Sequence, residues 1–268
     1  MNRAEGKAGA CVCLRSKILF PCILILLLLL LTASASASTL KNWKQYEQPE
    51  GETKTSPFMW YWVYEPDDMR PGLPLVIYLH SSNGLKKAAM RDMLPWLINE
   101  NVVKGIEAII LVPQLPGDYR HDTWAETIDS VNAVVEKVMD EYEVDRSRIS
   151  LTGFSLGGIG MWQLAAMAPG RYSRLMCICG KVEEDYDPAL FEGCEIKVYS
   201  STHDKKGNPA SSEAFVNKLV KAGISASYEL SKEGHKDVAD RLYRETDVHE
   251  WLWIIPDVHY SPAAETAK

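Results

Sequence analysis

The chain has 268 residues and a formal net charge of −7, with 46% hydrophobic and 24% charged residues. This length fits one sizeable domain or at most two small ones, and the composition is that of an ordinary soluble globular protein. The acidic balance argues against the broad positive surface that binds nucleic acids or anionic membranes, so neither is expected as a partner.

The first 40 residues differ from the rest of the chain. A basic segment precedes an almost purely apolar run from Ile18 to Leu31, and the small-residue stretch TASASASTL follows. This order is typical of a secretory signal peptide with Ala-x-Ala cleavage sites such as Ala35-Ser36-Ala37. We expect residues 1–37 to be a signal peptide and residues 38–268 to form the mature domain, secreted or periplasmic. An uncleaved membrane anchor is the alternative, since the small residues could extend the apolar run.

Cleavage would leave three of the six cysteines, Cys177, Cys179 and Cys194. Three cysteines make no disulfide framework for a chain of this length, although one bridge could form in an oxidising compartment. Small buried apolar residues are the favoured interpretation for Cys177 and Cys179.

After residue 40 the chain alternates short apolar runs with longer helical patterns and shows no internal repeat. Continuous apolar runs predict buried strands, and apolar residues at helical spacing predict helices. The expected strands are 59–66, 73–80, 107–114, 148–153, 175–180, 195–201 and 225–230, and the expected helices are 123–142, 156–167, 211–222 and 245–255. This alternation predicts an α/β fold with a doubly wound, mostly parallel sheet and helices on both faces. The connection between 180 and 195 is too short for a large lid domain.

A serine between glycines lies at the junction of an expected strand and an expected helix. Gly153-Phe-Ser155-Leu-Gly157 fits the pattern G-x-S-x-G in its required context of strand, turn and helix. Such a turn strains the serine and displays its hydroxyl above the sheet, and the glycines allow the strand and helix to approach. An ordinary Gly/Ser turn is the alternative, but the placement favours Ser155 as a nucleophile.

A serine nucleophile needs a base and an orienting acid, which follow it in the chain in proteins with this turn. Among the downstream histidines, we favour His235 as the base because it lies in a polar loop just after an expected strand. Asp204 ends the expected strand before that one and is the favoured acid. Asp185, Asp187 and Asp237 are alternatives, as is the possibility that Asp204 is a solvated surface residue.

Two backbone N–H groups are expected to stabilise an oxyanion. One belongs to Leu156 at the start of the helix, and the other to Ser81 or Ser82 after the expected strand 73–80, with Ser82 favoured. His80 is expected to be a structural residue of this loop. Trp124 could wall a substrate group, although most aromatic rings pack the core. No clustered His/Cys pattern is present in the sequence, so we expect neither a metal nor an organic cofactor.

These motifs together resemble the α/β-hydrolases, and more narrowly the secreted esterases often labelled predicted peptidases, which are related to feruloyl esterases and polyhydroxybutyrate depolymerases. The resemblance spans residues 73–253, and the segment Val144–Trp162 carries its most specific part; the other matching stretches are PLVIYLH, VPQLPG, CICG, EGH and HEWLW. It implies a triad of Ser155, Asp204 and His235 that hydrolyses esters through an acyl-enzyme.

The chain departs from the family pattern at two places. His80-Ser81 replaces the usual His-Gly, and the acid loop reads SSTHDKKGNP, without the family's Gly and its "VP" after Asp. A carboxylesterase acting on a small-molecule or polymer-borne ester is the favoured function. A serine peptidase is the second hypothesis, and a noncatalytic binding module on a hydrolase scaffold is the third. The sequence leaves the acyl preference and the oligomeric state open.

Overall fold

The computed structural model describes residues 43–47, 59–82, 105–115, 123–182, 185–204 and 207–253. These described residues all belong to one compact unit. The predicted signal peptide, residues 1–37, lies outside the described residues. No helix in the described ranges combines the length and the apolar character needed to cross a membrane.

In the described part of the chain, eight strands form one sheet in the order β1-β2-β4-β3-β5-β6-β7-β8. The pairings of β1 with β2 and of β2 with β4 are antiparallel, and all the others are parallel. The strands are β1 (Trp43–Glu47), β2 (Trp60–Tyr64), β3 (Leu75–Leu79), β4 (Ile109–Gln114), β5 (Ile149–Phe154), β6 (Arg174–Ile178), β7 (Glu195–Ser201) and β8 (Ser225–Ser231).

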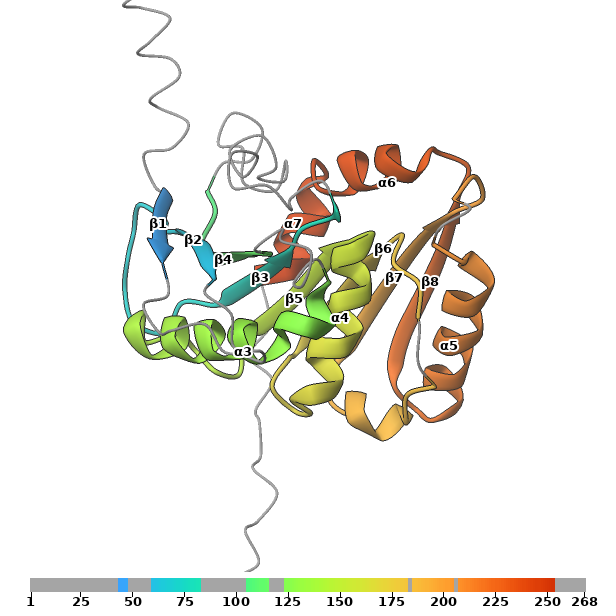
Figure 1. The fold of residues 1–268 in the computed structure, drawn as a ribbon, viewed down its shortest axis with the longest axis horizontal. Coiled ribbons are helices and arrows are strands. Elements are labelled where there is room, and N and C mark those ends of the chain that lie inside the picture. The colour runs from blue at the N-terminus through green and yellow to red at the C-terminus, as the bar shows by residue number, and fades with distance from the viewer. Residues whose placement is uncertain are drawn as a thin grey trace, which may run out of the picture. The chain divides into compact units, whose positions relative to one another are not determined.

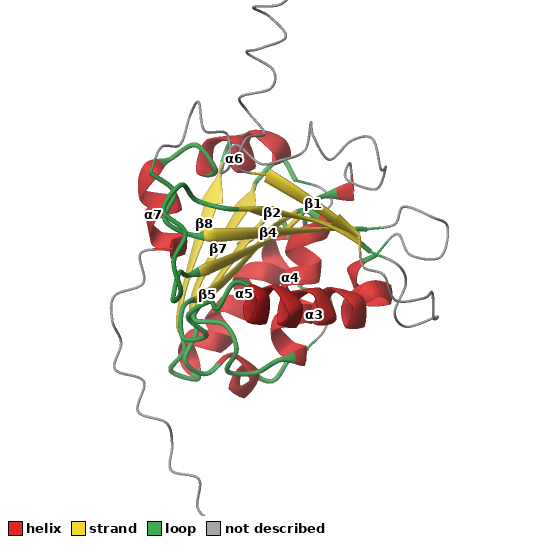
Figure 2. Cartoon of the chain, turned by 90° about the vertical axis from the view of Figure 1, so that its left-hand side faces the viewer, coloured by secondary structure: helices red, strands yellow, loops and turns green. Residues whose placement is uncertain are grey.

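Helices cover both faces of this sheet (Figures 1 and 2). One face carries α3 (Trp124–Glu141), α4 (Leu156–Met167) and α5 (Pro209–Lys221), and the other carries α6 (His235–Leu242) and α7 (Thr246–Trp253). The expected doubly wound, mostly parallel architecture is therefore confirmed. The connection from β6 to β7 holds a short 3-10 helix, η3 (Pro188–Phe191), whose buried Phe191 packs edge-on against Trp162 and Phe215.

The central strands are apolar on both faces because helices bury both. All five residues of β3 are buried. Leu75, Ile77 and Leu79 belong to the main hydrophobic cluster together with residues of α3 and α4. Tyr78, which alternates with them along the strand, instead packs edge-on against Tyr243 just after α6. This two-sided burial is the reason that a continuous apolar run, and not an alternating one, marks such a strand.

The sequence pattern predicts neither β1 nor α6. β1 is a short edge strand of sequence WKQYE, and its polar residues hide the strand signal. α6 was expected to be part of a polar loop, but His235 is the first residue of this helix. The helix has only eight residues, and its N-cap is Gly234, which has no side chain to cap it. Neither its length nor its N-cap residue therefore predicts a helix.

Candidate active site

Ser155 occupies a strained turn between β5 and α4. Its backbone angles are φ 56° and ψ −115°, a conformation that an L-residue adopts only when its surroundings enforce it. The enforcement is visible in two hydrogen bonds: the Ser155 N–H donates to the Ile178 carbonyl of β6 at 2.9 Å, and the Ser155 carbonyl accepts from the Ile159 N–H at 3.1 Å. Strain of this kind concentrates at functional sites.

The two glycines of the motif allow α4 to start directly against the sheet. A Cβ on Gly157 would lie 1.9 Å from the Leu79 carbonyl oxygen at the end of β3, and a Cβ on Gly153 would lie 2.2 Å from the Gly157 carbonyl oxygen. Both obstacles are backbone atoms, which cannot rotate away. Glycine is therefore required at both positions by close approach of the backbone.

Ser155, His235 and Asp204 form one hydrogen-bonded chain. The residues follow β5, β8 and β7, whose carboxyl ends lie at the same edge of the parallel sheet. The Ser155 Oγ lies 3.0 Å from His235 Nε2, and His235 Nδ1 lies 2.6 Å from Asp204 Oδ2. The Asp204 side chain is 3% exposed and the His235 side chain 30% exposed, so the acid is sheltered while the imidazole is reachable from solvent.

The carboxylate of Asp204 is fixed from two sides. Its Oδ1 accepts a hydrogen bond from the Gly207 N–H at 2.9 Å, while Oδ2 faces His235. A Cβ at Gly207 would lie 2.2 Å from Oδ2, so the loop closes tightly over the acid. A buried carboxylate needs such partners, because burial without them would favour its neutral form. The acid loop thus orients Asp204 even though it departs from the family pattern.

Three possible metal ligands meet at the same place. Among the described residues, Cys179, Asp204 and His235 are the group that could hold an ion, with their ligand atoms within 4.8 Å of one another. Both nitrogens of His235 already face Ser155 and Asp204. Burial, followed by the charge of Asp204, raises the pKa of the Cys179 thiol to about 12. With both imidazole nitrogens already in hydrogen bonds, the arrangement suits a proton-transfer chain.

The other two cysteines named in the sequence analysis are buried, and all three are free thiols. Burial raises the pKa of Cys177 and of Cys194 to about 12, so neither is a reactive thiolate. The favoured interpretation of Cys177 and Cys179 as small buried residues agrees with this placement.

Phe154 is a contact of the site that the sequence analysis did not identify. Its ring centroid lies 4.8 Å from that of His235, with an angle of 42° between the ring planes. The variable position before the serine therefore supplies an apolar wall behind the imidazole. An aromatic residue at this position could have been noticed, but its neighbour in space lies far along the chain and left no local signal.

His80 holds the loop after β3. The His80 side chain is fully buried, its Nδ1 donates to the Ser81 carbonyl at 2.7 Å, and its Nε2 accepts from the Leu115 N–H at 3.0 Å. Burial lowers the pKa of His80 to about 4, so the ring is neutral at physiological pH. Both ring nitrogens thus serve the main chain, and the loop that carries Ser82 is attached to the end of β4.

Leu156 and Ser82 are the residues expected to donate backbone N–H groups to the oxyanion. Leu156 is the first residue of α4, and the N–H groups of a first helical turn have no acceptor within the helix. The close packing of Gly157 on Leu79 and His80 brings this helix start to the end of β3, just before Ser82.

The structure places Trp124 in the core instead of on the wall of a substrate site. Its side chain is 1% exposed, its indole N–H donates to the His80 carbonyl at 3.3 Å, and its ring fills the space that a Cβ on Gly160 would need. A ring enclosed by protein on all sides has no surface left for a substrate. Trp124 instead packs against the loop that carries His80, with its ring centroid 4.9 Å from that of the His80 imidazole.

The alternative acids lie in other environments. Asp185 pairs with Lys218 of α5 at 2.5 Å, and Asp187 caps η3 by accepting from the Ala189 N–H at 3.1 Å. Asp237 lies in the first turn of α6, two residues after His235. Of the candidate carboxylates, Asp204 is the one whose oxygen faces the imidazole of His235.

Comparison with solved structures identifies the fold. A thermostable esterase superposes with a TM-score of 0.68 at 21% identity, covering 80% of this chain and 63% of its own, so this chain spans less than two thirds of that protein. An esterase from Pyrobaculum calidifontis gives a TM-score of 0.60 at 15% identity, covering 79% and 85%. The fluorophosphonate-binding serine hydrolase F of Staphylococcus aureus gives 0.59 at 11% identity, covering 78% and 97%.

No protein-family model matches the chain, and a search of curated proteins by sequence finds no significant match. The structural neighbours, together with the strand order and the turn at Ser155, show that the chain has the α/β-hydrolase fold. Because many activities share this fold, the activity has to be argued from the site.

Proposed function

We propose that this protein is a serine hydrolase that cleaves carboxylic esters through an acyl-enzyme intermediate. The observation that supports it is the continuous chain from Ser155 Oγ through the imidazole of His235 to Asp204, built on a strained strand–helix turn. Nucleophile, base and orienting acid in this geometry are the general signature of activated serine. That the structural neighbours include esterases and a serine hydrolase agrees with the proposal.

In the proposed mechanism, the Ser155 hydroxyl attacks the ester carbonyl while His235 Nε2 takes its proton. Asp204 accepts the hydrogen bond from Nδ1, which fixes the tautomer and stabilises the imidazolium that forms. The N–H groups of Leu156 and Ser82 stabilise the oxyanion, helped by the positive end of the α4 dipole. His235 then returns the proton to the leaving alcohol and activates the water that hydrolyses the acyl-enzyme.

More narrowly, we propose the secreted esterase group that the sequence resembles, with esters of small molecules or polymers as substrates. The β6–β7 connection packs its 3-10 helix on the core and not over Ser155, which agrees with a site without a large lid domain. Export rests on the signal-like pattern of residues 1–37, and the mass of the secreted protein would show whether cleavage follows Ala37.

The test is hydrolysis of a graded series of p-nitrophenyl and hydroxycinnamoyl esters, combined with labelling by a fluorophosphonate probe. Wild type should turn over esters and be labelled, whereas Ser155→Ala should do neither. Ser147→Ala is the matched control, because Ser147 hydrogen-bonds Asp145 on the surface, away from the site. Turnover or labelling that survives in Ser155→Ala would overturn the proposal. Amide hydrolysis at rates comparable to the matching ester would favour the peptidase hypothesis, and no turnover of either would favour a binding module.

A further inference from the structure

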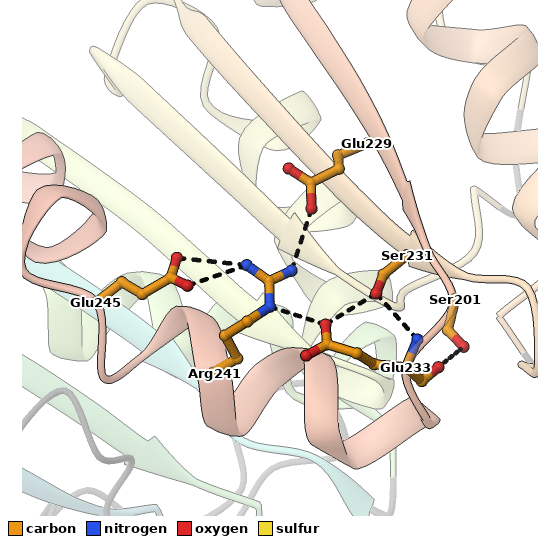
Figure 3. Close-up of polar contacts among 6 residues, drawn as sticks. All are labelled: Ser201, Glu229, Ser231, Glu233, Arg241 and Glu245. Atoms are coloured by element: carbon orange, nitrogen blue, oxygen red, sulfur yellow. Dashed lines mark hydrogen bonds and ion pairs between the residues drawn. The ribbon is translucent and has the colours of Figure 1, made fainter.

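A single arginine on α6 holds three glutamates beside the site. Arg241 donates from Nε to Glu233 at 2.8 Å, from Nη2 to Glu229 at 3.1 Å and from Nη1 to Glu245 at 3.2 Å (Figure 3). The hydrogen bonds from Arg241 and then Ser231 lower the pKa of Glu233, so its carboxylate is ionised. Because three separate nitrogens serve three carboxylates, the planar fork of arginine is needed here and lysine would not replace it.

Glu233 connects this arginine to the last residues of two strands. The Ser231 hydroxyl at the end of β8 donates to Glu233 Oε2 at 2.8 Å and accepts from the Glu233 N–H at 3.0 Å. The Ser201 hydroxyl at the end of β7 donates to the Glu233 carbonyl. Ser201 and Ser231 are cross-strand partners, so Glu233 is fastened to the final rung of the β7–β8 ladder.

The same rung carries the two loops of the candidate site. Glu233 precedes His235 by two residues, and the Ser201 carbonyl accepts from the Asp204 N–H at 3.1 Å. Ser201 Oγ also accepts from the His203 N–H at 3.1 Å. Gly234, the N-cap of α6, makes no side-chain cap, so the position of His235 at the helix start depends on the loop before it.

We propose that these side chains form a clip that positions His235 against Asp204 and Ser155, an inference that rests on the function proposed above. The clip consists of Ser201, Glu229, Ser231, Glu233, Arg241 and Glu245. Exposed ion pairs contribute little to stability, and three carboxylates around one guanidinium leave excess negative charge. A positioning role explains the arrangement better, because it joins the segment that leads to His235 and the segment that carries Asp204 at one point. None of the six touches the reacting atoms, so they are positioning residues.

Two substitutions remove the clip at opposite ends. Arg241→Met deletes the guanidinium, and Ser201→Ala deletes the tie to β7 without touching Arg241. Both should lower kcat by about 10-fold to 100-fold with KM changed by less than about twofold, because a small misplacement of a catalytic group slows chemistry more than binding. Arg241→Lys, which keeps the charge but has a single donor nitrogen, should have a kcat between those of wild type and Arg241→Met.

Matched controls separate positioning from loss of a surface contact. Arg146 also pairs with two carboxylates, Glu136 and Asp140, and Ser173 also donates to a backbone carbonyl, that of Ile149. Arg146→Met and Ser173→Ala should leave kcat within about twofold of wild type. Equal losses of kcat in the clip variants and in these controls would overturn the proposal.

A spectroscopic readout tests the clip even if the proposed function fails. The proton between His235 Nδ1 and Asp204 should give a low-field ¹H NMR resonance, since the bond is short and charge-assisted. The resonance should persist in Ser155→Ala and both controls but broaden or disappear in Arg241→Met and Ser201→Ala. Absence of ester turnover in wild type would refute the function alone. An unchanged resonance in folded Ser201→Ala, with unchanged kcat wherever wild type turns over, would refute the clip.

Discussion

The ring of Phe154 lies against the imidazole of His235, with the ring centroids 4.8 Å apart. Phe154 directly precedes Ser155, so the residue that leads into the proposed nucleophile also walls the proposed base. The imidazole is thereby bounded on three sides, by Phe154, by the Asp204 carboxylate and by the Ser155 hydroxyl.

We expect Phe154→Ala to lower kcat by about 10-fold, because the imidazole loses the wall that limits its rotation. Phe154→Leu keeps apolar volume at the same place and should lose less than the alanine variant. Steady-state kinetics on a p-nitrophenyl ester measures both. An alanine variant with wild-type kcat would show that the carboxylate alone orients the ring.

Asp204→Asn should lower kcat by about 10⁴-fold while the protein stays folded. The physical reason is the tautomer of His235. An amide N–H facing Nδ1 would make Nδ1 an acceptor and leave the ring proton on Nε2. Protonated Nε2 could not accept the proton of Ser155. Asp237→Asn is the matched control, since Asp237 lies on the same helix as His235, whereas the carboxylate that accepts the hydrogen bond from Nδ1 is that of Asp204. If the Asp237 variant lost activity and the Asp204 variant kept it, the assignment of the acid would be reversed.

Gly157→Ala should lower the free energy of unfolding by about 3 kcal/mol or prevent folding, because its Cβ would meet the Leu79 carbonyl oxygen at 1.9 Å. Gly170 offers a contrasting control. It has φ +77°, and no atom lies within 4 Å of the place that a Cβ would take there, so Gly170→Ala should cost about 1 to 2 kcal/mol from backbone conformation alone. Urea unfolding curves compare the two. Equal costs would mean that the backbone around residue 157 shifts to accept the Cβ, so that close approach does not require glycine there.

Elements with a strong local signal could be predicted from the sequence. The bounds expected for α4 and β7 agree with the structure: α4 begins directly after the strained serine and ends just before Pro169, and β7 alternates buried and part-exposed residues. The prediction that Ser155, His235 and Asp204 meet used the motif around Ser155, the order of acid and base along the chain, and the rule that the carboxyl ends of parallel strands share an edge.

What the sequence did not reveal depends on tertiary contacts. The eight residues of α6 are too few for a clear helical period, so the helix was read as a loop. The tryptophan at 124 was a candidate for a substrate wall because aromatic residues suit binding surfaces and cores alike, and only its neighbours His80 and Gly160 decide between them. The Arg241 clip joins β7, β8 and α6, and such a network leaves no mark in any one segment.

His80 should make the protein less stable as the pH falls from about 6.5 towards 4. Burial lowers its pKa from 6.5 to about 4, so between these values the unfolded chain binds a proton that the folded chain does not. The structure shows the reason: protonated Nε2 would point its N–H at the N–H of Leu115. The decrease in the free energy of unfolding caused by His80 is absent above the pKa of the unfolded chain. It is complete below the pKa of the folded chain, where it reaches about 3 kcal/mol.

Urea unfolding at pH 7 and pH 5 measures this contribution, which should be about 2 kcal/mol over that interval. His80→Gln removes the titrating group while keeping an acceptor, so its stability should fall less than that of wild type over the same interval. The exposed His203 lies outside this loop, and His203→Gln should retain the wild-type dependence. Identical pH dependence in wild type and His80→Gln would mean that the buried imidazole accepts a proton without breaking its bond to Leu115.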